Sequence, residues 1–163
     1  MALTWNKQNA MTKAEIDNFL AEKLVARVAT LRKEGTIHIT PLWYSWDENA
    51  LWLILGKKRQ HVNNLRRNPT ISIMIDKDVR PQEGNLKPGA QAVLLRGKAQ
   101  LFTDDKTQVE ATTTLLTRYL GSKGKNYVEV AIQDGSPGKN RVVVKLKPDK
   151  IVAWDFAKQP FTY

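Results

Sequence analysis

The stretch ALWLILGKKRQHVNNLRRNP, residues 50–69, passes from an apolar strand pattern through a basic loop into a helical pattern. Residues 50–55 place apolar side chains on both faces of an extended chain, which is typical of a strand that is covered on both sides. In a small antiparallel protein, a barrel interior and a partner subunit would supply the two covers. The stretch therefore predicts a β-barrel that forms a homodimer.

Strand patterns dominate the chain on either side of this stretch. Two β-rich runs, 24–32 and 36–46, flank Gly35, which can take the positive φ of a hairpin turn. Residues 47–49 form the next turn. Later runs of strand-like length and composition cover residues 71–75, 91–102, 141–146 and 150–156.

Helical patterns are fewer. Thr12 and Glu15 have the form of a capping box, which predicts a helix over residues 13–23. A second helix is expected over 60–67 and ends before Asn68-Pro69. A third helix is expected over 104–120, capped by Asp104 or Thr103, and a short one over 125–132. Residues 77–89 are expected to form a solvated loop.

This order of elements predicts a mainly β fold with inserted helices. Three strands precede the second helix, which favours an antiparallel barrel over a parallel α/β sheet. With 163 residues and 42% apolar content, residues 1–163 are expected to form one domain in which residues 1–11 are flexible. The first twelve residues hold no apolar run, and no later stretch reaches the roughly 18 apolar residues of a membrane helix. We therefore expect a soluble, cytoplasmic protein.

The composition excludes several kinds of site. The chain has no cysteine, which excludes disulfides, thiolate zinc sites and iron–sulfur clusters. His38 and His61 are its two histidines, so no metal site is expected. Walker, GxGxxG and GxSxG motifs do not occur. The net charge of +10 favours anionic ligands, from nucleic acid to phosphorylated small molecules.

The basic loop is the strongest candidate for an anion site. Gly56 allows close approach of the backbone, Lys57, Lys58 and Arg59 add positive charge, and the amides of the following helix favour an anion. The pattern predicts a phosphate cradle, although a solvated basic loop would look the same. His61 could contact the ligand from this segment or be structural.

His38 lies in an alternating strand, where a structural role is the more common one. The tryptophans could provide flat surfaces for a cofactor ring, or they could simply pack in the core and the interface. They are Trp5, Trp43, Trp46, Trp52 and Trp154.

Several segments, taken in their order and spacing, resemble the pyridoxamine-phosphate-oxidase-like family of flavin- or deazaflavin-binding split barrels. They are ARVATL (26–31), GTIHITPLWY (35–44), LILGKKRQHVNNLRRNP (53–69), LRGKA (95–99) and KPDKIVAW (147–154). The resemblance runs from about residue 12 to 156. It implies a six-stranded antiparallel split barrel that dimerises across its cofactor site.

The resemblance also implies a set of cofactor-binding residues. Residues 40–43 would line the ring system, and residues 55–59 would hold the phosphate and the sugar-like chain, with Lys57 and Lys58 as the main ligands. Asn63 is a weaker candidate one turn along the helix. The full set is Thr40, Pro41, Leu42, Trp43, Leu55, Gly56, Lys57, Lys58, Arg59, Asn63 and Trp154. No catalytic residue is assigned, because such a cofactor carries out the hydride or electron chemistry itself.

The function expected from the resemblance is an FMN-dependent oxidoreductase of unknown substrate. True pyridoxamine-phosphate oxidases carry an arginine-rich C-terminal segment that ends near arginine–leucine–proline, whereas residues 154–163 read WDFAKQPFTY. This departure argues against pyridoxal-phosphate synthesis. The alternatives are a reductase that uses 8-hydroxy-5-deazaflavin, a flavin- or haem-binding protein without turnover, and, from another class, a basic barrel that binds single-stranded nucleic acid.

Overall fold

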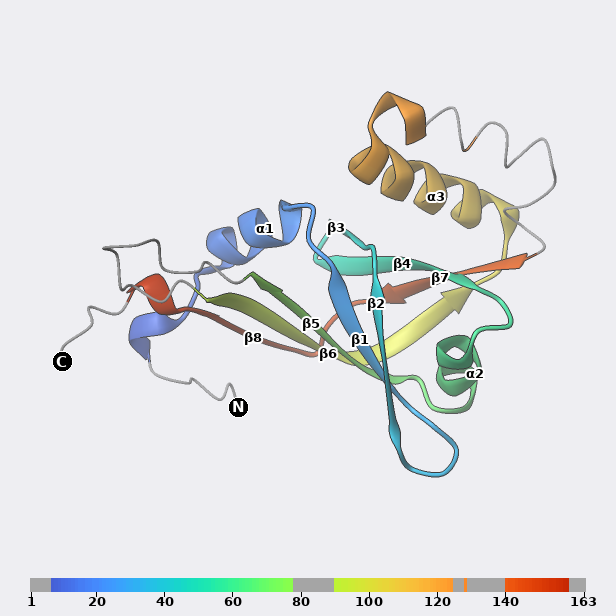
Figure 1. Ribbon diagram of the computed structural model, residues 1–163, viewed down its shortest axis with the longest axis horizontal. Coiled ribbons are helices and arrows are strands. Elements are labelled where there is room, and N and C mark those ends of the chain that lie inside the picture. The colour runs from blue at the N-terminus through green and yellow to red at the C-terminus, as the bar shows by residue number, and fades with distance from the viewer. Residues whose placement is uncertain (1–6, 78–89, 125–127, 129–139, 159–163) are drawn as a thin grey trace.

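The computed structural model describes residues 7–77, 90–124, 128 and 140–158 (Figure 1). Their strands form one curled antiparallel sheet in the order β2-β1-β5-β6-β7-β4-β3, and β8 also pairs with β6. The strands are β1 (Ala26–Leu31), β2 (Ile37–Leu42), β3 (Ser45–Asp47), β4 (Ala50–Gly56), β5 (Thr70–Lys77), β6 (Gln91–Phe102), β7 (Arg141–Leu146) and β8 (Lys150–Asp155).

Helices connect and cover the strands. The α-helices are α1 (Lys13–Ala21), α2 (Gln60–Arg67) and α3 (Asp105–Leu120), and the short 3-10 helices are η1 (Lys7–Asn9) and η2 (Phe156–Lys158). None of the helices in the described ranges is both long and apolar enough to span a membrane. The prediction of a mainly β split barrel with inserted helices is confirmed.

The long strand β6 curls the sheet. Residues 91–98 of β6 pair with β5, while residues 91–96 pair with β8 on its other edge. Residues 99–102 then pair with β7, which continues to β4 and β3. One strand thus belongs to both halves of the sheet and holds them around a shared core.

Most predicted elements lie within two residues of the observed ones, but the run 36–46 is two strands. β2 pairs with β1, whereas β3 pairs with β4 in the other half of the sheet. The chain crosses between the halves at Trp43 and the fully buried Tyr44. The strand pattern continues through this crossing, so periodicity alone could not reveal it. Lys77, the first residue of the predicted loop over 77–89, ends β5, and residues 78–89 and most of the predicted helix over 125–132 lie outside the described residues.

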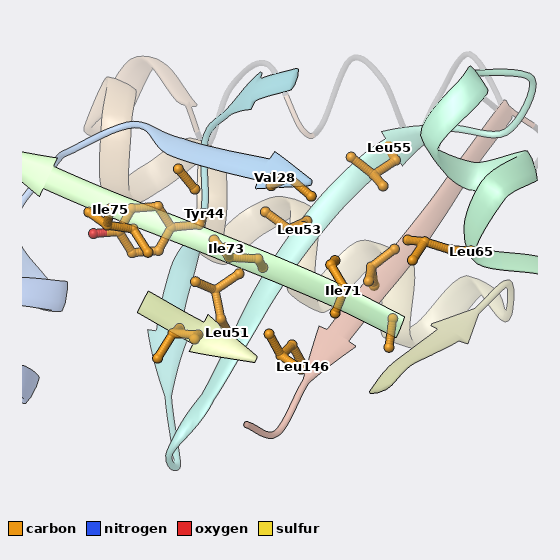
Figure 2. Close-up of a cluster of buried hydrophobic side chains, with 14 of the residues drawn as sticks. Val28, Tyr44, Leu51, Leu53, Leu55, Leu65, Ile71, Ile73, Ile75 and Leu146 are labelled. Atoms are coloured by element: carbon orange, nitrogen blue, oxygen red, sulfur yellow. The ribbon is translucent and has the colours of Figure 1, made fainter. Parts of the chain in front are cut away.

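The core lies inside the curled sheet (Figure 2). Leu51, Leu53 and Leu55 of β4 point into it and are at most 1% exposed. The opposite face of β4 carries Trp52 and Ile54, which are half-buried, and α3 packs against β4 and β7. A helix of the same chain therefore covers at least part of this face, where the sequence pattern alone indicates a partner subunit.

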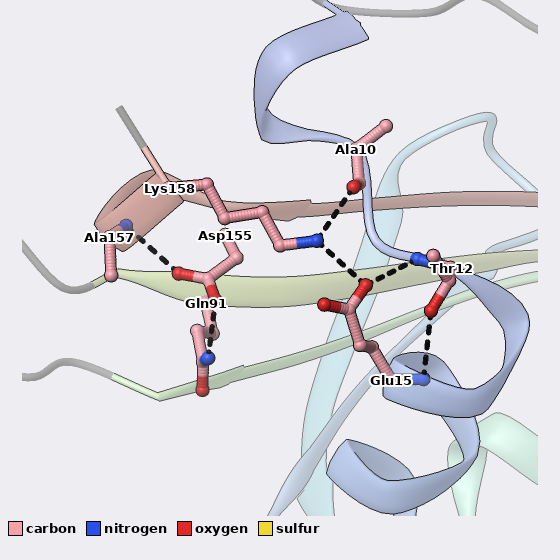
Figure 3. A network of polar contacts seen from close by, with 7 residues as sticks. All are labelled: Ala10, Thr12, Glu15, Gln91, Asp155, Ala157 and Lys158. Atoms are coloured by element: carbon pink, nitrogen blue, oxygen red, sulfur yellow. Dashed lines mark hydrogen bonds and ion pairs between the residues drawn. The ribbon is translucent and has the colours of Figure 1, made fainter. Parts of the chain in front are cut away.

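A polar network ties α1 to the end of β8 (Figure 3). Thr12 and Glu15 form the predicted capping box. Lys158 Nζ donates to Glu15 Oε2 at 2.7 Å and to the Ala10 carbonyl at 3.0 Å. The hydrogen bond from Lys158, followed by that from the Thr12 amide, lowers the pKa of Glu15 to about 2. The ionised carboxylate is thus favoured in the folded state.

We expect Glu15→Gln to lower the melting temperature at pH 7 and to flatten its dependence on acid. Since the pKa of Glu15 falls from 4.5 to about 2 on folding, its stabilising effect is complete above pH 4.5 and is lost as the pH falls towards 2. Circular dichroism melts from pH 7 to pH 2 measure this. Glu34→Gln is the control, because the Glu34 side chain is 59% exposed and lies 3.8 Å from Arg32. Identical profiles for wild type and Glu15→Gln would contradict the contact.

Candidate functional site

The basic loop, residues 57–59, joins β4 to α2 and has a fixed backbone. Gly56 pairs with Arg141 of β7, and the Lys57 amide donates to the Asn140 carbonyl at 2.8 Å. The Arg59 amide donates back to the Gly56 carbonyl at 2.9 Å. The side chains of residues 57–59 are exposed. A rigid turn thus presents three cationic side chains to solvent, and Arg141, on the neighbouring strand, was not among the predicted site residues.

The first turn of α2 opens directly onto this loop. The N-cap residue Arg59 makes no side-chain capping hydrogen bond, and the first turn contains no acidic residue. The amides at such a helix N-terminus favour an anion. The fully buried Asn64 holds the helix against β1, because its side chain donates to Thr30 Oγ1 at 3.0 Å. Asn64 also accepts from Gln60 Nε2 at 2.9 Å. The loop and helix end together form a preorganised cationic surface.

Two of the predicted residues near the loop have structural contacts. The Leu55 side chain is buried beside Leu65 (Figure 2), so only the backbone of Leu55 could face a ligand. Asn63 is exposed, and its Oδ1 accepts from Arg66 Nη1 at 3.3 Å. The same Arg66 nitrogen donates to the Lys57 carbonyl at 3.3 Å. Arg66 therefore links Asn63 to the loop and belongs to the same surface.

Thr40 is connected to α2 through the two histidines. Its Oγ1 lies 2.9 Å from His38 Nε2, and the His38 ring centroid lies 6.1 Å from that of His61 in α2. The neighbouring Pro41 is exposed, whereas Leu42 packs against the core. Sequence patterns could not pair His38 with His61, because 22 residues and a change of element separate them.

Trp43 lies beyond β2 and is supported by α3. Its ring stacks on Tyr119 with centroids 4.6 Å apart and planes at 3°. The Tyr119 hydroxyl donates to the Leu24 carbonyl at 2.6 Å, and this hydrogen bond holds the Tyr119 ring in place. Trp43 remains 42% exposed, so part of its ring can receive a flat ligand. Tyr119, which the sequence analysis does not name, is therefore a candidate site residue.

Trp154 is not brought to the basic loop within one chain. It lies on β8, pairs with Ala92 and forms a bridge with Ala10. In Figure 1 this end of β8, next to η2, lies at the opposite end of the sheet from α2. The structure therefore gathers the predicted phosphate residues and connects Thr40 to them, but it leaves Trp154 apart.

The site suits a phosphate better than a metal ion. Within the ranges that the structure describes, no three His, Asp, Glu or Cys side chains are grouped so that they could hold a metal. Cationic side chains and helix amides are instead the groups that bind phosphate oxygens most strongly. The loop geometry fits a phosphorylated cofactor.

The chain matches one protein family over most of its length. The family model described as pyridoxamine 5'-phosphate oxidase matches residues 12–155. A search of curated proteins finds no significant match.

Solved structures share the fold at low sequence identity. The conserved hypothetical protein Rv2991 from Mycobacterium tuberculosis is 22% identical, with a TM-score of 0.79 over 98% of this chain and 96% of that one. A FAD-binding protein from Mesorhizobium loti is 17% identical, with a TM-score of 0.63 over 90% and 96% of the two chains. An F420 reductase is 20% identical, with a TM-score of 0.57 over 83% and 94%.

Proposed function

This chain belongs to the pyridoxamine 5'-phosphate oxidase family, and on that premise we propose that it is a cytoplasmic oxidoreductase that binds FMN by its phosphate. The observation that carries the proposal is the rigid basic loop at the uncapped N-terminus of α2. Lys57 and Lys58 hold the phosphate, and the helix amides add to its stabilisation.

The shape of the site favours an elongated ligand over a lone phosphate. His38 lies against His61 of α2, and Trp43 follows His38 by five residues. At the rise of an extended strand, five residues span about 16 Å. A ligand that joins the loop to Trp43 therefore carries a phosphate at one end and a flat ring at the other. FMN has this form, and its ring supplies the hydride chemistry, so the protein's residues bind and orient it.

The same residues would accept a phosphorylated 8-hydroxy-5-deazaflavin, and the similarity to an F420 reductase supports this as the second candidate. Haem binding without turnover is a third outcome of the test below.

We also propose that the site is completed in a homodimer. Trp154 lies away from the basic loop of its own chain, so a second copy is needed if Trp154 is to contact the cofactor. The outer face of the β1–β2 hairpin leaves Leu31, Ile37 and Ile39 exposed, and a second copy would cover it.

The cofactor is identified on protein purified from its own host. We expect the absorbance of oxidised flavin and, after release, the mass of FMN. The mass of a phosphorylated deazaflavin would favour the second candidate, and a Soret band would favour haem. A colourless protein that takes up none of the three would contradict the proposal. Oligonucleotide affinity that falls steeply with salt would then support nucleic-acid binding.

A further inference from the structure

His61 is a buried histidine in the first turn of α2, directly after the basic loop. Its side chain is 6% exposed, and its Nε2 has no hydrogen-bond partner within the described part of the chain. A buried polar nitrogen without a partner is unfavourable, because it has lost its hydrogen bonds to water. The phosphate contacts proposed above do not use this side chain.

His38, on β2, lies against His61 and has a hydrogen-bond partner for each of its ring nitrogens. The two ring planes meet at 26° with centroids 6.1 Å apart. A guanidinium can only donate, so the contact of 3.3 Å from Arg32 Nη2 makes His38 Nδ1 an acceptor. His38 then carries its proton on Nε2 and donates it to Thr40 Oγ1 at 2.9 Å. Both nitrogens of His38 are thus engaged, whereas Nε2 of His61 has no partner among the described residues.

The surroundings keep His61 neutral in the free protein. Burial lowers the pKa of His61, and the positive charge of Arg59 lowers it further. Arg32, which contacts His38, also lies 3.8 Å from the carboxylate of the exposed Glu34. The other charged groups around the pair are Lys57 and Lys58 of the loop, and Arg66 and Arg67 of α2, which donate to the Lys57 and Leu31 carbonyls.

We propose that His61 is a proton-linked element of the anion site, which takes up one proton from solvent when a phosphate monoester binds at residues 57–59. The inference rests on the proposed function, because it assumes that the phosphate lies at the N-terminus of α2. A phosphate there brings a charge of about −1.5 to −2 next to the helix turn that carries His61. This charge stabilises the imidazolium and offsets the penalty of burial.

Proton uptake fixes the sign of the pH dependence. His61 is neutral in the free protein and charged in the complex, so affinity rises as the pH falls from 8.0 to 6.5. A site made only of Lys and Arg gives the reverse trend. Those side chains stay charged throughout, while the phosphate loses charge as the pH approaches its second pKa, near 6. A site that includes His61 and a site made only of Lys and Arg therefore predict opposite changes of affinity with pH.

Isothermal titration of FMN and of riboflavin at pH 6.5 and 8.0, each in two buffers of different ionisation enthalpy, tests the proposal. We expect wild type to bind FMN about 5- to 30-fold more tightly at pH 6.5, with net proton uptake. Riboflavin has no phosphate, so its affinity should not change with pH. The proton count in wild type is decisive even if a variant fails to fold.

Two variants separate the roles of the two histidines. His61→Gln is expected to lose the gain at pH 6.5. His38→Gln is the matched control and should keep the gain, since both nitrogens of His38 already have hydrogen-bond partners. Proton release, or weaker binding of FMN at pH 6.5, would overturn this inference and leave the proposed function standing. Failure of FMN to bind at either pH would overturn both.

Discussion

Lys57→Ala and Lys58→Ala are each expected to weaken FMN binding by roughly tenfold to over a hundredfold. A charge-assisted hydrogen bond to phosphate contributes about 1.5–3 kcal/mol, which corresponds to this range of dissociation constants. Both side chains are exposed, and within the described residues neither forms an ion pair. The fold should therefore remain intact, and the loss should be confined to the ligand.

Riboflavin separates the phosphate from the rest of the cofactor. It shares the ring and ribityl chain of FMN, so its weaker affinity should hardly change in either variant. Lys23→Ala is the matched control, because Lys23 is equally exposed and lies between α1 and β1. Titration of both ligands into wild type and the three variants measures the effect. If FMN and riboflavin lose affinity equally, or if neither does, the basic loop does not hold the phosphate.

The local parts of the fold and site could be predicted because their causes are local. The capping box of Thr12 and Glu15, the turn at Gly35 with φ of 86°, and the end of α2 before Pro69 each depend on residues within one turn. The position of the basic loop between β4 and α2 could also be predicted, since strand, glycine, cations and helix start follow one another in the chain. These features needed no knowledge of the rest of the molecule.

The parts that could not be predicted depend on contacts between distant segments. The stack of Trp43 on Tyr119 and the pairing of His38 with His61 arise only when α3 and α2 pack on the sheet. The cover of β4 by α3 has the same origin. An apolar strand pattern indicates that both faces are covered, but it does not tell a helix of the same chain from a partner subunit.

Because α3 covers at least part of that face, the argument for a homodimer moves from β4 to the β1–β2 hairpin. β2 is an edge strand, and its outward residues Ile37 and Ile39 are 67% and 63% exposed. Leu31 pairs with Ile37 and is 37% exposed on the same face. Exposed apolar side chains along an unpaired edge invite association with another chain. A second copy of the chain would bury this face and could bring its Trp154 towards the cofactor.

Ile39→Asp is accordingly expected to raise the dimer dissociation constant more than a hundredfold and to weaken FMN binding in parallel. Burying an unpaired carboxylate among apolar side chains costs several kcal/mol, and about 3 kcal/mol already corresponds to that factor. The folded monomer should be retained, because position 39 is solvent-exposed in a single chain. Analytical ultracentrifugation over a dilution series, together with FMN titration, measures both effects. Leu120→Asp is the control, since Leu120 is 43% exposed at the far end of α3 and should leave the dimer unchanged. A wild-type protein that is a stable monomer and binds FMN at full affinity would refute the dimeric site, and an unaltered dimer in Ile39→Asp would move the interface away from this hairpin.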